Sequence, residues 1–114
     1  MSFFESEVVK EELIQINELQ MEIYGSFHKF PYMNKEERIE HIEKLEELLE
    51  KQHILYTRLS LSDDEDAQKM KQNILETAQL LGFAPNANMN EIFQETAKTL
   101  NRLKETIDRM ENLR

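Results

Sequence analysis

Two stretches of the chain repeat apolar residues at alternating steps of three and four, and this spacing constrains the fold more than any other feature. The first repeat comprises Ile42, Leu45, Leu49, Gln52, Tyr56 and Leu59. The second comprises Phe93, Thr96, Leu100, Leu103, Ile107 and Met110. Such steps return to one face of an α-helix, so each stretch predicts a long helix with a narrow, heptad-patterned seam. The seam's partner is either the other seam of the same chain or the same helix in a second copy.

The remaining sequence extends this pattern to four helices in a single domain, residues 1–114. They are predicted at about residues 3–24, 35–60, 63–81 and 89–112, with a loop at 25–34 that contains Pro31. Residues suited to capping precede the predicted starts; they are Ser2 or Ser6, Asn34, Ser62 and Asn88. Gly25 and Gly82 are placed where the first and third helices are expected to stop. The short connections favour antiparallel neighbours. The fold class predicted is all-α, an antiparallel bundle of three to four helices.

Charge narrows the range of partners. The chain has 23 acidic and 14 basic side chains, which leaves a net charge of −9. Such a surface repels nucleic-acid phosphates and anionic membranes, and it suits a basic protein partner. The sequence contains neither an apolar run long enough to cross a bilayer nor a secretory start, and it contains no cysteine. We expect a cytoplasmic protein that binds neither nucleic acid nor membrane.

Motifs for catalysis or cofactor binding are missing. The absence of cysteine excludes thiol nucleophiles and zinc–thiolate sites, and the two glycines are too far apart for a phosphate-binding loop. Glu50 and His53 have the i,i+3 spacing used in di-iron bundles, but a second motif of this kind is missing. We therefore expect no enzyme activity, no cofactor and no catalytic residue, and a metal-binding bundle is the weakest of the alternatives.

The segment from residue 24 to residue 33 concentrates aromatic side chains. Its candidate partner-binding residues are Tyr24, Phe27, His28, Phe30, Tyr32 and Met33. Aromatic residues and methionine anchor protein interfaces. Alternatively, these side chains are buried and the segment closes one end of the core. We favour core closure over partner binding by about two to one. Phe3 and Phe4 raise the same question. They are candidates for self-association together with Leu100, Leu103, Ile107 and Met110.

The opening run Phe3-Phe4-Glu5-Ser6-Glu7-Val8-Val9, followed by Glu11-Glu12, resembles the start of a family of small, functionally uncharacterised proteins. The family occurs in cyanobacteria and in the contractile-tailed phages that infect them. The stretch Arg58-Leu59-Ser60-Leu61-Ser62 and the later order of helix, Gly82, Pro85 and final helix are similar too. The resemblance implies a cytoplasmic setting in such a bacterium or its phage, and it brings no activity and no site residues.

These observations favour a non-enzymatic helical interaction protein, which would act as an adaptor, an assembly factor or a modulator of a host protein complex. A self-assembling structural oligomer of a phage or cellular assembly is the alternative. The two seams favour a homodimer in either case.

Overall fold

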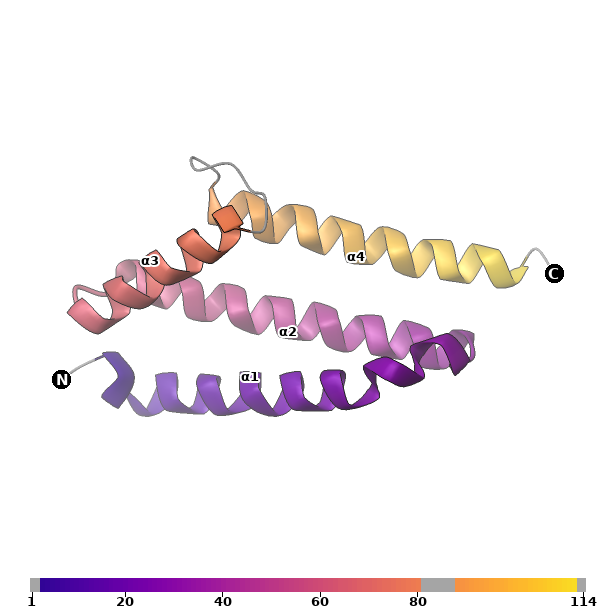
Figure 1. Cartoon of the computed structure of the whole chain (residues 1–114), viewed down its shortest axis with the longest axis horizontal. Coiled ribbons are helices and arrows are strands. Elements are labelled where there is room, and N and C mark those ends of the chain that lie inside the picture. Colours follow the sequence, from indigo (N-terminus) through magenta and orange to yellow (C-terminus); the bar gives the residue numbers. More distant parts are fainter. Residues whose placement is uncertain (1–2, 81–87, 113–114) are drawn as a thin grey trace.

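The computed structural model describes residues 3–80 and 88–112 of the 114-residue chain (Figure 1). A short 3₁₀ helix, η1 (Phe3–Glu5), precedes α1 (Glu7–Ser26). A second 3₁₀ helix, η2 (Phe27–Tyr32), leads into α2 (Lys35–Leu61). The chain then forms α3 (Glu65–Leu80) and α4 (Met89–Asn112). Every regular element in the described ranges is helical, so the predicted all-α class is confirmed.

The three long helices lie side by side with α2 in the middle (Figure 1). Polar contacts show that both neighbours run antiparallel to α2. On one side Lys44 and Arg58 contact Glu22 and Glu12 in turn. On the other side Glu46 and His53 contact Lys104 and Asn90 in turn. The shorter α3 packs on the C-terminal part of α2. The principal extents are 56, 31 and 19 Å, so the molecule is a flattened antiparallel helical bundle, as predicted.

The main hydrophobic core lies between α1 and α2. Its buried members are Val9, Ile16, Leu19, Ile23, Leu48 and Leu55. Phe3 and Phe4 pack against this cluster from η1. The most deeply buried large side chains are Ile23, Ile42 and Leu59. Since α2 is covered from two sides, its buried surface is wider than the single seam predicted, and it includes Leu48 and Leu55 as well.

The seam of α4 packs on α2 of the same chain. The Phe93 ring lies 6.0 Å from the Tyr56 ring, and Ile107 is buried. The sequence left two partners open for this seam, a helix of the same chain or a second copy. In the structure the partner is α2 of the same chain.

The loop predicted at residues 25–34 is wrong. Helix α1 continues through Gly25 to Ser26, and η2 follows at once. The Ser26 hydroxyl donates hydrogen bonds to the carbonyls of Glu22 and Ile23 at 3.1 and 3.3 Å, which satisfies the end of α1. Pro31 does not break the segment, because a short 3₁₀ helix tolerates a residue without an N–H near its end.

The predicted caps are confirmed at two helix starts and wrong at a third. The Asn34 side chain accepts a hydrogen bond from the Glu37 backbone amide, and the Glu37 carboxylate accepts one from the Asn34 backbone amide. Asn88 accepts from the Asn90 amide at 2.8 Å. Helix α3 starts at Glu65 rather than at residue 63, and its cap is Asp64 instead of Ser62. Ser62 ends α2, which runs one residue past the predicted boundary.

Helix α1 starts at Glu7, after Ser6 and not at residue 3, and the Ser6 side chain makes no capping hydrogen bond. The predicted cap at Ser2 and the predicted helix end at Gly82 lie outside the described residues.

Candidate functional site

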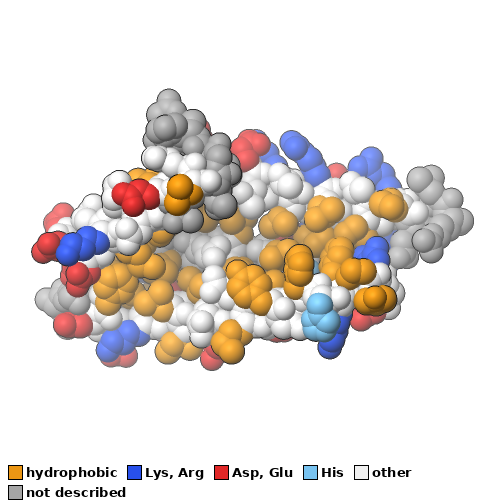
Figure 2. Space-filling model, in the orientation of Figure 1, with side chains coloured by type: hydrophobic (Ala, Val, Ile, Leu, Met, Phe, Trp, Pro, Cys, Tyr) orange, Lys and Arg blue, Asp and Glu red, His pale blue; other side chains and the backbone are white. Residues whose placement is uncertain are grey.

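An apolar groove opens between the helices, and we call it the front groove. It has a volume of about 540 Å³. It is lined by α1 (Leu13, Ile16, Asn17, Gln20), α2 (Gln52, Leu55, Tyr56, Leu59), α3 (Met70, Ile74) and α4 (Met89, Ile92, Phe93). Apolar side chains gather along the middle of the layer, between α1 and α4, in the view of Figure 2. The groove lies where α1, α3 and α4 meet over the C-terminal half of α2, and the short α3 does not fill the space between them.

No lysine, arginine, aspartate or glutamate is among the described residues that line the front groove. Its polar groups are the amides of Asn17, Gln20 and Gln52 and the phenol of Tyr56. The chain has 37 charged side chains, and those in the described residues lie outside the groove. The groove is therefore chemically distinct from the rest of the surface. Neutral amides among apolar side chains suit a protein ligand better than a charged small molecule.

A second groove lies on the other side of the α1–α2 pair and has the opposite chemistry; we call it the acidic groove. It is lined by Gln15, Glu18, Leu19, Glu22, Glu47 and Lys51. The Lys44 Nζ lies 2.6 Å from the Glu22 carboxylate, and this hydrogen bond raises the pKa of Lys44. Three glutamates remain exposed around this groove, so the groove is a solvated face, and its ion pair joins α1 to α2.

The aromatic residues predicted to bind a partner divide into exposed and anchoring members. Tyr24, Phe27 and Tyr32 are 69, 65 and 89% exposed. Phe30 and Met33 are half-buried, so they hold η2 against the protein. His28 is exposed. Part of the segment thus packs against the protein, and the rest of it is exposed, so that partner binding by the exposed members stays a prediction.

The exposed aromatics continue the front groove along α1. Tyr24 lies one helical turn beyond Gln20, and Phe27 lies seven residues beyond it, so all three share one side of the helix. We call the front groove together with Tyr24 and Phe27 the front face. This face runs along α1 from Leu13 to the turn into α2.

The turn between α1 and α2 is held rigidly. Arg38 donates hydrogen bonds from Nε to the Phe30 carbonyl at 3.3 Å and from Nη2 to the Pro31 carbonyl at 3.0 Å. Its guanidinium also lies 5.4 Å from the centre of the Phe30 ring. An aromatic surface that is fixed before binding loses little conformational entropy when a partner arrives.

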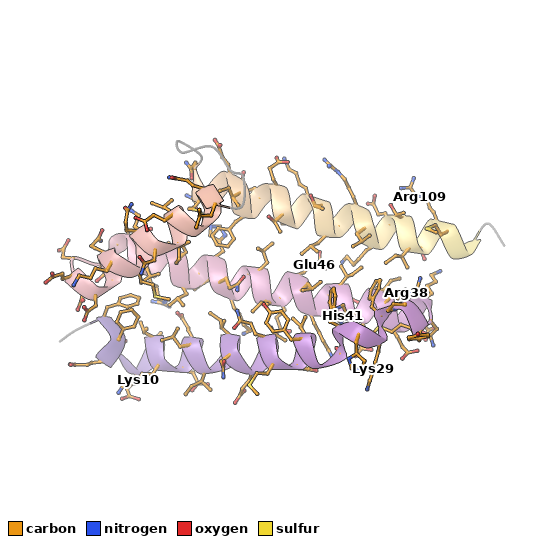
Figure 3. All side chains as sticks on the ribbon, in the orientation of Figure 1. Lys10, Lys29, Arg38, His41, Glu46 and Arg109 are labelled. Atoms are coloured by element: carbon orange, nitrogen blue, oxygen red, sulfur yellow. The ribbon has the colours of Figure 1, made fainter. Side chains whose placement is uncertain are left out.

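Beneath this turn lies His41, which the sequence analysis did not single out. Its side chain is 4% exposed and points between α2 and the end of α1 (Figure 3). The rings of Phe27 and Phe30 are 6.4 and 5.5 Å from it. Nε2 has no hydrogen-bond partner among the described residues. Burial lowers the pKa of His41, and the nearby Lys44 lowers it further, so the neutral ring is favoured.

The residues predicted for self-association do not form one surface. Phe3 and Phe4 meet edge to face at 5.1 Å and are half-buried against their own core. The Phe3 amide donates a 2.7 Å hydrogen bond to Asp64, which ties η1 to the start of α3 and lowers the pKa of that carboxyl. On α4, Leu100 is half-buried and Ile107 is buried, whereas Leu103 and Met110 are 42 and 63% exposed.

The Glu50–His53 pair has surroundings unlike a metal site. The His53 ring stacks on Phe93 with centroids 4.6 Å apart, and Nε2 lies 3.0 Å from Oδ1 of Asn90. Within residues 3–80 and 88–112, no group of three potential metal ligands comes together. One nitrogen of the His53 ring is therefore already paired with an amide, and a phenylalanine ring covers one face of the imidazole.

None of the helices in the described part of the chain is long and apolar enough to cross a bilayer.

Sequence reasoning missed the front groove. The heptad rule identifies positions that face a neighbouring helix, but Leu13, Gln20 and Gln52 face a site that α3 leaves uncovered. The amides at Asn17 and Gln20, on the same side of α1 as Leu13, were the available signal, because a fully buried seam rarely carries two amides in succession.

Comparison with known proteins gives one match. Residues 1–107 match the family described as a domain of unknown function, DUF1825. The chain belongs to this family. No curated protein and no solved structure matches the chain. Membership therefore agrees with the resemblance of the opening residues to an uncharacterised family, and it assigns no activity.

Proposed function

We propose that the protein is a non-enzymatic interaction protein that binds an amphipathic helix of another protein on its front face. It would act as an adaptor, an assembly factor or a modulator of a protein complex, in the cytoplasm of a cyanobacterium or during infection by its phage. The observation that carries this proposal is an uncharged groove, open along four helices and extended by two exposed aromatic residues.

The shape of the groove favours a helical ligand. Three antiparallel helices and a short α3 leave the position that a further long helix would occupy in a closed bundle. Half-buried Leu13, Ile74 and Ile92 offer apolar surface to such a helix, and Gln20 and Gln52 offer neutral hydrogen bonds. Helix-in-groove recognition uses this arrangement, with apolar anchors at i, i+3, i+4 and i+7 of the ligand.

The charge of the chain adds a second property of the partner. The docked stripe has to be apolar, because the groove has no charged group among its described residues to neutralise a ligand charge. The net charge of −9 attracts proteins that are basic elsewhere on their surface. A basic protein with an exposed amphipathic helix satisfies both conditions.

The test is capture of proteins from an extract of the source organism by the purified chain and by point variants. Gln52→Lys places a charge in the groove floor, and Tyr24→Ala removes an exposed aromatic anchor. Each variant is expected to reduce the captured partner by at least about tenfold, the typical cost of losing a hot-spot contact. Thr57→Lys adds the same charge at an exposed position of α2 that does not line the front groove, and it serves as the matched control.

Circular dichroism and thermal melting of each variant confirm that the fold is retained. If Gln52→Lys and Tyr24→Ala capture the same proteins as the unchanged chain, in the same amounts, the front face is not the docking surface and the proposal fails.

A further inference from the structure

Helix α4 presents a second heptad stripe that does not face α2. Its members step by four, three, four, three and four along the helix: Ile92, Thr96, Thr99, Leu103, Thr106 and Met110. Thr99, Leu103, Thr106 and Met110 are exposed, and Ile92 and Thr96 are half-buried. The α2-facing residues Phe93, Leu100 and Ile107 form a separate row. We call the exposed row the threonine stripe.

The threonine stripe is apolar in practice, because its hydroxyls are already satisfied within α4. Thr96 donates to the Ile92 carbonyl at 2.8 Å, and Thr99 donates to the Glu95 carbonyl at 2.9 Å. Thr106 donates to the Arg102 carbonyl at 2.9 Å. These i−4 bonds leave the polar atom on the helix backbone and the methyl group free to pack.

Charge opposes the approach of a second copy less at α4 than at α1. Helix α4 carries five acidic and four basic side chains, whereas α1 carries five acidic side chains and one basic. The net negative charge of the chain therefore lies mainly outside α4. Repulsion between two acidic chains is weaker where α4 meets α4 than where α1 meets α1, since exposed charges farther apart than about 8–10 Å are largely screened.

We infer that the threonine stripe pairs with the same stripe of a second copy, antiparallel and related by a two-fold axis near Asn101. In this register Ile92 meets Met110 of the second copy. Thr96 meets Thr106, and Thr99 meets Leu103, so large side chains lie beside small ones or beside a flexible methionine. The stripe is self-complementary in its spacing only when the copies run antiparallel, as an isologous contact requires.

The flanking charges agree with this register. Glu95 and Arg109 each precede a stripe residue, and antiparallel pairing brings Glu95 of one copy beside Arg109 of the other. Arg109 points away from α2 (Figure 3). The contact shares only Ile92 with the front groove, so it goes beyond the proposed function and does not depend on it.

The dimer is expected to be weak. The stripe runs from residue 92 to residue 110, which is about 27 Å of helix. A single helix pair of that length buries less than the roughly 800 Å² per partner typical of stable complexes. We therefore expect dimers that form at high protein concentration and dissociate on dilution.

Disulfide trapping tests the register, because the natural chain has no cysteine. A Thr96→Cys chain is mixed with a longer, tagged Thr106→Cys chain under mild oxidation at about 1 mM total protein. The antiparallel register brings these two positions together, whereas either variant alone places its cysteines about 15 Å apart. We expect a mixed disulfide dimer at least about tenfold more abundant than either self-linked product.

Thr57→Cys mixed with Thr106→Cys is the matched control. Thr57 is also exposed and also bonds to its own helix, through the His53 carbonyl, but it lies on α2. Adding Leu103→Lys to both chains is expected to abolish the mixed dimer.

Equal yields from the mixed pair and the control overturn the inference, as does the absence of any mixed dimer. Preferential self-linking of Thr96→Cys overturns it too, since that product reports a parallel pair. None of these results bears on the capture experiment, which tests the front groove and Tyr24.

Discussion

The front groove and the acidic groove lie on opposite sides of the same helix pair and differ in almost every chemical respect. Leu13, Asn17 and Gln20 of α1 face the front groove, whereas Gln15, Glu18 and Glu22 face the acidic groove. Each helical residue turns the side chain by about 100°, so neighbouring positions reach different sides. Charge is thus kept on one side of the layer while an uncharged surface is left open on the other.

The contacts between α1 and α2 show the same division. On the acidic side Lys44, Lys51 and Arg58 recur every seven residues, and each finds a partner on α1 at 2.6–3.1 Å. His41, on the same helix, has no hydrogen-bond partner for its Nε2 among the described side chains. The polar side chains around the acidic groove pair with one another within the chain. On the front face, by contrast, apolar side chains stay exposed. We therefore propose exposed apolar area, rather than charge, as the mark of the contact surface of this protein.

The largest expected effect concerns the floor that supports the front groove. Leu59 is fully buried and lines the groove, whereas Leu61, two residues later, is 81% exposed. Leu59→Ala is expected to lower the free energy of unfolding by about 2–5 kcal/mol, because it removes packed methyl groups and leaves a cavity. Leu61→Ala is expected to change it by about 0.5 kcal/mol or less. Urea unfolding of both variants measures the two values, and similar losses would mean that α2 is not packed as described.

An intermediate effect is expected from His41. Its pKa is lowered in the folded protein, so folding does not favour the charged ring. Above the ordinary histidine pKa of about 6.5 the ring is neutral in both states and costs nothing. As the pH falls below about 6.5, the unfolded chain takes up the proton first, and the free energy of unfolding decreases until the folded pKa is passed.

The measurement is urea unfolding at pH 7.5 and pH 5.5. His41→Phe keeps a ring beside Phe27 and Phe30 and is expected to flatten the decrease in stability between the two pH values. His28→Gln, at an exposed position, is the matched control and is expected to leave the decrease unchanged. An equal decrease in the unchanged chain and in His41→Phe would assign the pH dependence to other groups.

The smallest effect is expected on the acidic side. The Arg58 Nε lies 2.7 Å from the Glu12 carboxylate, with side-chain exposures of 47 and 18%. A double-mutant cycle with Glu12→Gln and Arg58→Met is expected to give a coupling energy of about 0.2–1 kcal/mol, since solvent screens a half-exposed pair. A coupling several times larger would show that the ion pairs of this side, and not apolar packing, hold α1 on α2.

The sequence predicted the helices well but not their connections. Periodicity located all four helices, and Asn34 and Asn88 marked two of the starts correctly. The segment 25–34 was misjudged because Gly25 and Pro31 are breakers only on average. Here α1 continues through Gly25, and the Arg38 side chain satisfies the carbonyls of Phe30 and Pro31 near the end of η2.

The candidate site was only partly predictable. The aromatic segment could be recognised from composition, but which of its members are exposed depends on how η2 packs over His41. The α4 seam mixed two rows, since steps of three and four do not separate Phe93, Leu100 and Ile107 from Thr96, Leu103 and Met110. Only the position of α2 distinguishes them. The front groove depends on the length and placement of α3, which no local pattern encodes.

The most direct test of the central claim, that the uncharged side and not the acidic side meets other proteins, is site-specific photo-crosslinking in the cell. A photoreactive amino acid is placed at Gln20, which lines the front groove, or at Glu18, which lines the acidic groove two residues earlier on α1. The account predicts that the chain substituted at position 20 crosslinks to a distinct protein and that the chain substituted at position 18 does not. Crosslinking from position 18 alone, or equally from both positions, would contradict it.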